Sequence, residues 1–302
     1  MLPQLGNDLF LTDGGMETWL VHERGFELPQ FASFPLLDDR RGVEALRAYF
    51  APYLELARAG GAGLVLDAPT WRASSHWGTL LGYDEAELAD FNRRAVAFVD
   101  ELRKEASDVR VVVGGCVGPC DDAYAPSDQV GPDDAYAYHR PQIETFAETA
   151  AEFVNALTLT YSAEAIGVAR AANAAGLPVA ISFTVETDGR LPGGETLGDA
   201  IAAVDGAVEV DYFMVNCAHP THFAGVLDDG EWRDRVWGVR ANASMKSHAE
   251  LDEADELDAG NPSELASHYP SLRERLPNLR VAGGCCGTDD RHIAAIFEAL
   301  RD

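Results

Sequence analysis

Short apolar runs alternate with longer amphipathic stretches along almost the whole of the 302-residue chain. A short apolar run bounded by polar or turn-forming residues is typical of a buried strand, whereas a longer stretch with apolar residues three or four positions apart is typical of a helix packed on a core. The short runs predict strands over residues 9–12, 64–67, 109–114, 156–160, 179–183, 212–215, 236–240 and 280–282.

The amphipathic stretches predict helices between these strands. About eight strand and helix units in this order favour a parallel (β/α)8 barrel of the TIM type, and a doubly wound open sheet is the alternative. No Pro/Ser-rich linker divides the chain, so we expect a single barrel domain over residues 1–302. The expected helices cover residues 43–59, 84–105, 133–151, 163–175, 197–204, 220–227, 263–276 and 290–300.

In a barrel of this kind the carboxyl ends of the strands meet at one mouth, which is where active sites lie. Several short polar motifs directly follow predicted strands, so residues that are far apart in the sequence are expected to converge there. These motifs contain Asp13, Thr70, Gly118, Thr184, Cys217, Cys285 and Cys286.

The cysteines in these motifs predict a metal site. Cys285 and Cys286 are adjacent in a glycine-rich turn, and Cys217 ends the segment Val-Asn-Cys after the sixth predicted strand. Glycine lets the backbone turn tightly enough to aim neighbouring sulfurs at one ion. Three thiolates would leave the fourth position of a tetrahedral zinc open for a substrate, and the alternative is three buried, inert thiols.

The same segments carry a family resemblance. The opening Asp-Gly-Gly-Met-Glu-Thr (13–18), the pair Asn-Cys (216–217) and Gly-Gly-Cys-Cys-Gly-Thr (283–288) resemble the signatures of the homocysteine S-methyltransferase family. Shorter matches follow in the family's order at Val-Gly-Pro (117–119), Tyr-His-Arg-Pro (138–141) and Ser-Phe-Thr (182–184).

The resemblance implies that zinc, bound by Cys217, Cys285 and Cys286, activates the thiol of homocysteine. No protein side chain is then expected to act as a catalyst beside the metal-activated substrate thiol.

The resemblance also implies a substrate site around the first strand. The carboxylate of Asp13 would hold the substrate ammonium, and the backbone amides of Gly14 and Gly15 would receive the substrate carboxylate. This division suits the residue types, because a carboxylate complements an ammonium and glycine allows close approach of the backbone to a ligand. Glu17 would assist, or would simply face solvent early in a helical turn, and Asn216 is also expected to bind substrate.

One position departs from the family pattern. Family members usually carry a Glu at the end of the fourth strand, where it helps bind the amino group of homocysteine, and the matching stretch here places Ala156 at that position. The next carboxylate is Glu164, which is expected on the following helix. Thr158, Thr160 or Tyr161 can supply neutral hydrogen bonds instead. The resemblance therefore supports thiol methylation more firmly than homocysteine itself.

Two further groups near the expected mouth have open roles. Trp71 and Trp77, beyond the second predicted strand, are candidates to hold a cationic methyl donor by cation–π attraction, or they pack as ordinary loop residues. His219, two residues after Cys217, is expected to pack or to cap a helix, and a zinc ligand or a hydrogen-bond partner of a ligand is the alternative.

Composition limits the classes of binding partner and the cellular compartments that we expect for this protein. The formal net charge of −27 argues against nucleic acid and anionic membrane surfaces, which attract basic patches. No apolar run reaches the roughly 20 residues that span a bilayer, and no basic segment followed by an apolar one opens the chain, so we do not expect export. Five cysteines form a poor disulfide framework and must stay reduced to hold metal, which favours the cytoplasm.

Together these features predict a zinc-dependent S-methyltransferase that moves a methyl group from a small donor to a thiol, with homocysteine as the first acceptor. S-methylmethionine is the donor favoured by exclusion, because the chain has no room for the cobalamin and folate modules of large methionine synthases and no long arm like that of betaine-dependent enzymes. Two alternatives stay open, namely a different thiol acceptor and a zinc-binding sensor without turnover. The sequence leaves the oligomeric state undecided.

Overall fold

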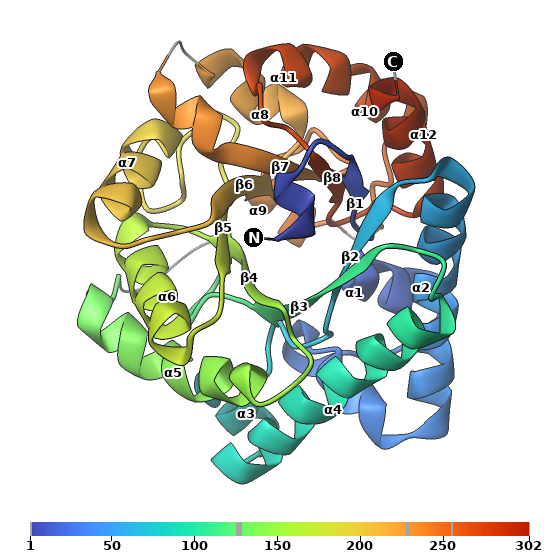
Figure 1. The fold of residues 1–302 in the computed structure, drawn as a ribbon, viewed down its shortest axis with the longest axis vertical. Coiled ribbons are helices and arrows are strands. Elements are labelled where there is room, and N and C mark those ends of the chain that lie inside the picture. The colour runs from blue at the N-terminus through green and yellow to red at the C-terminus, as the bar shows by residue number, and fades with distance from the viewer. Residues whose placement is uncertain (1, 125–128, 228–229, 255, 302) are drawn as a thin grey trace.

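The computed structural model describes residues 2–124, 129–227, 230–254 and 256–301. Its eight strands are parallel and pair in sequence order, and β8 pairs with β1 to close a barrel (Figure 1). The predicted (β/α)8 barrel is therefore confirmed. The strands are β1 (Phe10–Leu11), β2 (Gly63–Asp67), β3 (Val111–Val117), β4 (Phe153–Leu159), β5 (Val179–Phe183), β6 (Tyr212–Asn216), β7 (Val236–Ala241) and β8 (Val281–Gly284).

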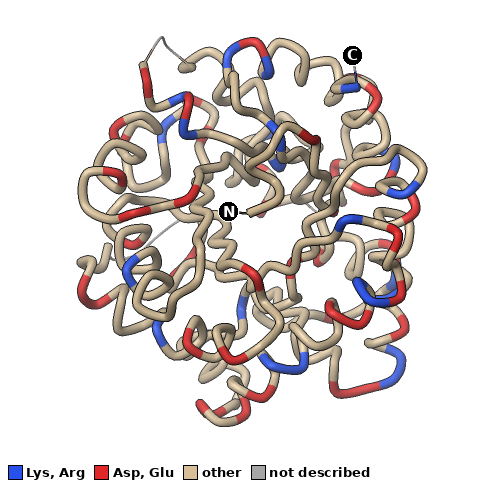
Figure 2. Tube along the Cα trace, in the orientation of Figure 1, with Lys and Arg blue, Asp and Glu red and all other residues tan. Residues whose placement is uncertain are grey.

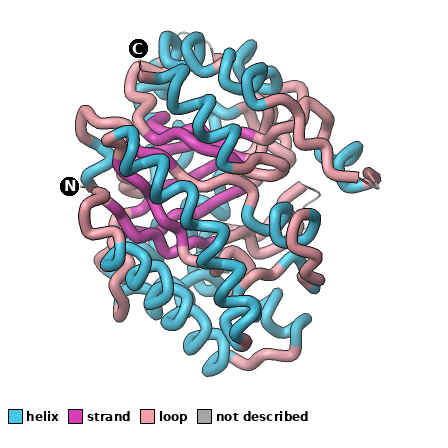
Figure 3. The backbone as a smooth tube through the Cα atoms, turned by 90° about the vertical axis from the view of Figure 1, so that its right-hand side faces the viewer, coloured by secondary structure: helices cyan, strands magenta, loops and turns pink. Residues whose placement is uncertain are grey.

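Helices surround the strands on all sides (Figure 3). The α-helices are α1 (Met16–His22), α2 (Arg40–Gly60), α3 (Ser75–Leu81), α4 (Glu85–Glu105), α5 (Pro132–Ala147), α6 (Ser162–Ala175), α7 (Leu197–Ala207), α8 (Pro220–Phe223), α9 (His248–Asp252), α10 (Pro262–Ser267), α11 (Tyr269–Arg275) and α12 (Asp290–Leu300). The 3-10 helices are η1 (Pro3–Leu5), η2 (Pro29–Phe31), η3 (Phe34–Asp38), η4 (Ala224–Val226) and η5 (Glu231–Arg235).

Two predicted helices end earlier than expected. The helix expected over 263–276 is divided into α10 and α11, because Pro270 has no N–H to continue a helical ladder. The helix expected over 133–151 ends at Ala147. There the Thr149 hydroxyl donates to the Phe146 carbonyl and accepts from the Ala151 amide, so a side-chain turn replaces the last helical turn. As a result β4 begins at residue 153, three residues before the predicted strand.

Side chains alternate along each strand between two cores. Phe10, Val65, Phe153 and Met214 belong to a cluster inside the barrel, near the ends at which the strands begin. We call this cluster the barrel floor. The intervening strand residues pack against the helices in a larger core that surrounds the barrel. This two-core arrangement follows from the two-residue period of a strand.

The N-terminal residues close the barrel below the floor. The short helix η1 lies across the opening at this end (Figure 1), and Leu2 packs into the floor cluster. The side-chain amide of Gln4 donates to the hydroxyl of Tyr212 at 3.3 Å, and both side chains are buried. A ligand can therefore reach the barrel interior more easily from the opposite end, at which the strands finish.

Positions of Lys, Arg, Asp and Glu are spread along the chain all around the barrel rather than gathered in one part of the trace (Figure 2). Many pair with a neighbour, as Arg47 does with Glu101 and Glu105 at 3.1 and 2.9 Å. Exposed pairs of this kind contribute about 0–1 kcal/mol each. No helix among the described residues combines the length and the apolar character that crossing a membrane requires.

Candidate active site

The ends of β6 and β8 bring the three predicted metal ligands together. Cys217 directly follows β6, and Cys285 and Cys286 directly follow β8. One sulfur from each residue lies within 4.8 Å of the other two, and the Sγ atoms of Cys217 and Cys286 are 3.6 Å apart. Among the described residues, no fourth His, Cys, Asp or Glu joins this group.

The backbone at Cys217 adopts a conformation that residues with a side chain rarely take. Its φ is 55°, in the left-handed region. Three donors hold its carbonyl oxygen, namely Thr184 Oγ1 at 3.2 Å, Asn242 Nδ2 at 3.1 Å and His248 Nε2 at 2.7 Å. Backbone strain of about 1–3 kcal/mol persists only where the surroundings fix it, and it is common at functional sites. The fold thus aims the Cys217 sulfur at the other two.

Hydrogen bonds favour negative charge on one sulfur of the cluster, that of Cys285. The thiols of Cys217 and then Cys286 hydrogen bond to Cys285, which lowers the pKa of Cys285 well below its ordinary value. The Tyr124 hydroxyl lies 2.8 Å from Cys217 Sγ, and burial raises the pKa of Tyr124, so this phenol keeps its proton and can donate a hydrogen bond to a Cys217 thiolate. Three soft thiolates suit zinc, so the residues present fit the predicted metal.

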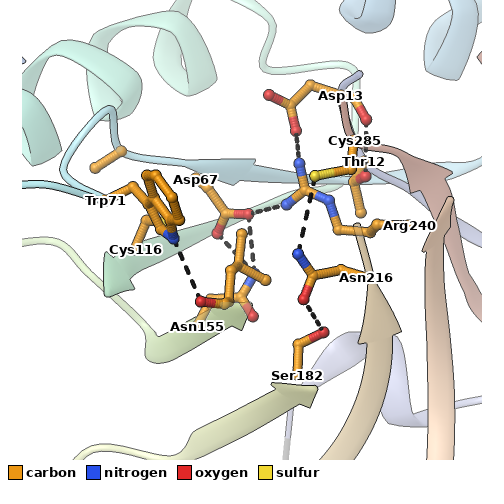
Figure 4. Close-up of polar contacts among 12 residues, drawn as sticks. Thr12, Asp13, Asp67, Trp71, Cys116, Asn155, Ser182, Asn216, Arg240 and Cys285 are labelled. Carbon is orange, nitrogen blue, oxygen red and sulfur yellow. Dashed lines mark hydrogen bonds and ion pairs between the residues drawn. The ribbon is translucent and has the colours of Figure 1, made fainter. Parts of the chain in front are cut away.

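Asn216 joins the end of β6 to the two preceding strands. Its Oδ1 accepts from Ser182 Oγ at 2.6 Å (Figure 4) and also from the Thr158 amide at 2.8 Å. Its Nδ2 donates to Thr158 Oγ1 at 2.8 Å and contacts Cys285 Sγ at 3.9 Å. Thr158 itself has a φ of 64° and lies where the β4–β5 register shifts. Asn216 therefore orients one sulfur, and its role in binding substrate stays a prediction.

An ion cluster lies beside the sulfurs and spans the mouth. Arg240, on β7, forms salt bridges with Asp13 and Asp67, the second at 2.6 Å (Figure 4). The Tyr49 hydroxyl donates to Asp13 Oδ2 at 3.0 Å, and Asn155 Nδ2 donates to both oxygens of Asp67 at 3.0 and 2.9 Å. All of these side chains are buried. Burial raises the pKa of Asp13 to about 6, although the Arg240 charge opposes the rise.

This cluster bears on the predicted role of Asp13. Its carboxylate already contacts Arg240 and Tyr49, so a substrate ammonium would be a third partner. Two carboxylate oxygens offer about four acceptor positions, which leaves room for that partner. Asp13 also lines the same cavity as Cys285. Ammonium binding by Asp13 stays a prediction.

The glycines after β1 bring the first loop against the sulfur loop. A Cβ on Gly14 would lie 2.6 Å from the Thr288 carbonyl oxygen, and one on Gly15 would lie 2.6 Å from the Cys285 carbonyl oxygen. Larger residues would push the two loops apart. The Gly15 amide donates to the Thr288 carbonyl at 3.0 Å, so binding a substrate carboxylate there would require exchange of that hydrogen bond.

Glu17 lies in the first turn of α1 and faces the same cavity. Its Oε1 accepts a hydrogen bond from Ser33 Oγ at 2.8 Å. Burial nevertheless raises the pKa of Glu17 to about 7. Its carboxyl group is therefore partly protonated near neutral pH, and its assistance in substrate binding stays a prediction. The lining of this cavity includes Asp13, Glu17, Asp67, Arg240, Cys217 and Cys285.

Comparison with known proteins assigns the family. The family model described as homocysteine S-methyltransferase matches residues 10–300. The chain belongs to the homocysteine S-methyltransferase family. Its enzymes are S-methyltransferases, as the resemblance of the motifs implied.

Solved structures of the homocysteine methyltransferase MmuM from Escherichia coli share the fold. The metallated form matches with a TM-score of 0.76 and 22% identity, covering 97% of this chain and 96% of that chain. The oxidized form matches with a TM-score of 0.77 and 23% identity, covering 96% and 95%. Among curated proteins, the methionine synthase of Mycobacterium leprae (strain TN) is 32% identical over 146 residues, which are 47% of this chain and 12% of that protein.

The structure corrects the position that was aligned with the fourth-strand Glu of the homocysteine S-methyltransferase family. Ala156 packs in the helix-facing core, whereas its neighbour Leu157 lines the cavity. A shift of one residue along a strand moves the side chain to the opposite face. The sequence comparison that chose Ala156 therefore selected a side chain that faces the helices rather than the cavity. Glu164 lies on α6 and contacts His139 at 2.9 Å. The strand β4 itself contains no carboxylate.

Each of the two tryptophans has the guanidinium of Arg72 against its ring. The guanidinium of Arg72 lies 4.0 Å from the ring centroid of Trp71 and 3.5 Å from that of Trp77. The indole N–H of Trp71 donates to the Leu157 carbonyl at 3.3 Å, and that of Trp77 donates to the Pro119 carbonyl at 3.1 Å. These contacts hold both rings in their loops, but Trp71 also lines the mouth cavity, so donor binding by the tryptophans stays a prediction.

His219 does not join the sulfur cluster. It is the N-cap of α8, where its Nδ1 accepts from the Thr221 amide at 3.3 Å. The expectation that His219 caps a helix is confirmed.

Sequence reasoning missed Asp67, Tyr124 and Arg240. Asp67 is the last residue of β2, and Arg240 lies near the end of β7. The cysteines were found because active sites of such barrels lie at the carboxyl ends of the strands, and the same reasoning applies to these two residues. Tyr124 has no comparable signal, because it lies in the loop after β3 and meets Cys217 only through the fold.

Proposed function

We propose that this protein is a zinc-dependent S-methyltransferase that transfers a methyl group from S-methylmethionine, or a similar small sulfonium, to homocysteine and so forms methionine. The observation that carries the proposal is the group of three cysteine sulfurs at the barrel mouth, which has no fourth protein ligand among the described residues. Membership of the homocysteine S-methyltransferase family supports the reaction class.

In this proposal Cys217, Cys285 and Cys286 hold the zinc. A bound zinc lowers the pKa of a coordinated substrate thiol and leaves its sulfur nucleophilic. Asn216 and Tyr124 donate hydrogen bonds to the cysteine sulfurs, which fixes their direction and spreads their charge. The pocket then has to place the donor methyl carbon in line with the acceptor sulfur.

The transfer is a substitution at the methyl carbon. The acceptor thiol gives up its proton, and a lone pair of its sulfur attacks the methyl carbon opposite the donor sulfur. The new C–S bond forms as the old one breaks, and the electron pair of the old bond returns to the donor sulfur. The donor changes from a positive sulfonium to a neutral thioether, and the acceptor becomes the second thioether.

The charges around the cavity suit positively charged ligands. Asp13, Glu17 and Asp67 line it together with a single guanidinium, that of Arg240. A charge-assisted contact between a carboxylate and an ammonium contributes about 1.5–3 kcal/mol. This supports an amino-acid acceptor whose ammonium meets Asp13, and a cationic donor whose charge the carboxylates stabilise before the methyl group moves.

A second candidate keeps the zinc–thiolate chemistry and uses a different thiol acceptor. The observation that favours it is the apolar Leu157 where β4 faces the cavity, because this side chain provides no partner for an ammonium. A sensor without turnover is a third candidate, and it would require a fourth protein ligand to saturate the metal. For all three we expect small-molecule partners and a reducing compartment such as the cytoplasm.

The decisive experiment combines metal analysis with a transfer assay. Zinc-loaded protein is incubated with several thiols and methyl donors, and the products are identified by mass spectrometry. We expect methionine from homocysteine and S-methylmethionine, and loss of both zinc and product in Cys217→Ser, Cys285→Ser and Cys286→Ser. If all three variants keep stoichiometric zinc at low free metal, the site is wrong. If no thiol accepts a methyl group at full zinc occupancy, the sensor is favoured.

The choice of acceptor is tested at β4. Leu157→Glu places a carboxylate in the cavity, so the preference for homocysteine over an amino-blocked analogue should rise. Ala156→Glu is the matched control, since it places the same charge in the helix-facing core and should lower stability without changing that preference. A wild type that prefers the amino-blocked thiol would favour the second candidate.

A further inference from the structure

A second group of metal-binding residue types lies outside the sulfur cluster. His219 ends the loop that leads from β6 into α8, and Glu264 and His268 lie one turn apart at α10. One ligand atom from each residue lies within 4.8 Å of the other two. Residues four apart on a helix share one face, so α10 presents Glu264 and His268 together toward His219.

The carboxylate of Glu264 lies between the two imidazoles. Its Oε1 is 2.7 Å from Nε2 of His268, and its Oε2 is 3.6 Å from Nε2 of His219. The ring centroids of the two histidines are 5.3 Å apart. His219 is fully buried, whereas the side chains of Glu264 and His268 are 42% and 27% exposed. The imidazole of His219 is thus buried at the base of the site, and the side chains of Glu264 and His268 at its edge are open to water.

The base of this site contains a polar atom without a partner. Nε2 of His219 is buried and has no hydrogen-bond partner among the described residues. Its 3.6 Å separation from Glu264 is too long for a hydrogen bond. Buried polar atoms normally have a partner, so an unpaired imidazole nitrogen directed at a carboxylate and a second imidazole points to a missing ligand.

The other nitrogen of His219 is arranged as in metal-bound histidines. Its Nδ1 is 2.8 Å from the hydroxyl oxygen of Thr221. With the proton on Nδ1, that nitrogen donates to the Thr221 hydroxyl instead of accepting from the Thr221 amide, and Nε2 has a free lone pair for a metal. Histidine ligands usually donate their second N–H in this way, which fixes the ring and the tautomer.

We propose that His219, Glu264 and His268 form a second divalent-metal site, separate from the three-cysteine site. Two imidazoles and a carboxylate are a ligand set that zinc accepts, with water at the remaining positions. The same set accepts other first-row metals that bind imidazole. The exposed sides of Glu264 and His268 give a path for the ion and room for its waters.

The position of this site gives it a structural consequence. His219 lies two residues after Cys217 in one loop, and Glu264 belongs to a helix that packs against α12. A metal here ties the loop that carries one cysteine ligand to the outer helix layer. A ligand that binds only the folded state raises the unfolding temperature, so occupancy should stabilise the protein.

The test counts metal ions in full-length, reduced protein. Metal-free protein is equilibrated with zinc at a series of buffered free concentrations, and the bound zinc per chain is measured. We expect one ion at low free zinc, held by the thiolates, and a second at higher free zinc. His268→Gln and Glu264→Gln should abolish the second ion and its increase in melting temperature. The exposed residues His76 and Glu274 supply the controls, and His76→Gln and Glu274→Gln should keep both ions.

Cobalt separates the two sites by their spectra. Cobalt at the thiol site produces intense sulfur-to-metal charge-transfer absorption, whereas a site of imidazole and carboxylate produces none. His268→Gln should keep the charge-transfer band and lose only the additional ion. The proposal is overturned if wild type binds one ion over the whole range, or if His268→Gln and Glu264→Gln bind as many ions as wild type. The methyl-transfer assay is independent of this result, so either proposal can fail without the other.

Discussion

The two halves of the barrel interior come from the same strands but contain opposite kinds of side chain. On β4, Phe153 belongs to the apolar floor, and two residues later Asn155 holds Asp67 at the mouth. On β6, Met214 packs in the floor, and two residues later Asn216 binds the residues around the sulfurs. On both of these strands, the side chain that faces the interior changes from apolar to polar between one inward-facing position and the next.

This difference shows how stability and function are divided. The floor is held by the burial of apolar surface, which does not depend on direction. At the mouth, Arg240 forms salt bridges with Asp13 and Asp67, so one carboxylate charge remains without a compensating cation within this triad. Buried charges cost several kcal/mol each unless paired. The mouth therefore gives up stability and gains a net negative charge, which suits the cationic ligands of the proposed function.

Arg240→Met breaks the mouth half of this comparison and should have the largest effect. It leaves Asp13 and Asp67 buried without their cation, so we expect the free energy of unfolding to fall by about 3–5 kcal/mol. Urea denaturation measures this. Arg170→Met, which removes an exposed pair with Asp133, is the control and should cost about 0–1 kcal/mol. Equal effects of the two substitutions would contradict the buried-triad account.

Met214→Ala tests the floor in isolation. Removing a buried methionine side chain leaves a cavity, so we expect a loss of about 2–5 kcal/mol in unfolding free energy. Zinc content and the catalytic efficiency of the folded protein should stay at wild-type levels, because Met214 does not line the mouth cavity. Loss of zinc under folding conditions would show that floor and mouth are coupled.

Asp13→Asn tests the mouth without changing its shape. The variant should keep its zinc, yet lose about 1.5–3 kcal/mol of charge-assisted binding to a substrate ammonium. Catalytic efficiency with homocysteine should therefore fall by roughly 10- to 150-fold. An amino-blocked thiol is the internal control, since its use should change much less. An equal loss with both thiols would mean that Asp13 acts mainly through Arg240.

Glu17→Gln should have the smallest effect. It measures how much the ionised carboxyl group of Glu17 lowers the free energy of unfolding. Burial raises the pKa of Glu17 from 4.5 to about 7, so its contribution to stability is present below pH 4.5 and is lost as the pH rises through 7. Relative to wild type, the variant should therefore become more stable as the pH rises across this range.

We expect this relative gain to be roughly 1 kcal/mol, since Glu17 is only partly buried. Denaturation of zinc-loaded protein at several pH values measures it. A difference between the two proteins that does not change with pH would contradict the raised pKa.

The order of the elements was predictable because it depends on local patterns. The strand over 179–183 and the helix over 290–300 have the bounds that their apolar spacing predicts. Errors arose where a single side chain changed the local hydrogen bonding, as at Pro270 and Thr149. Cys217 was also predicted to lie beside Cys285, because each follows a strand and the parallel strands of a closed barrel end at one rim.

The sequence alone identified the three cysteines that meet at the mouth, and the tertiary structure decided which partners the residues at the mouth have. Arg240 pairs with Asp13 across 227 positions, and His219 meets Glu264 from another loop, and neither contact has a local signal. The fold also decided which side of β4 faces the cavity. A shift of one residue along this strand replaces Ala156 by Leu157 as the side chain that faces the cavity. The spacing of apolar residues along the sequence predicts which positions are buried, whereas contacts between distant segments exist only after the barrel closes.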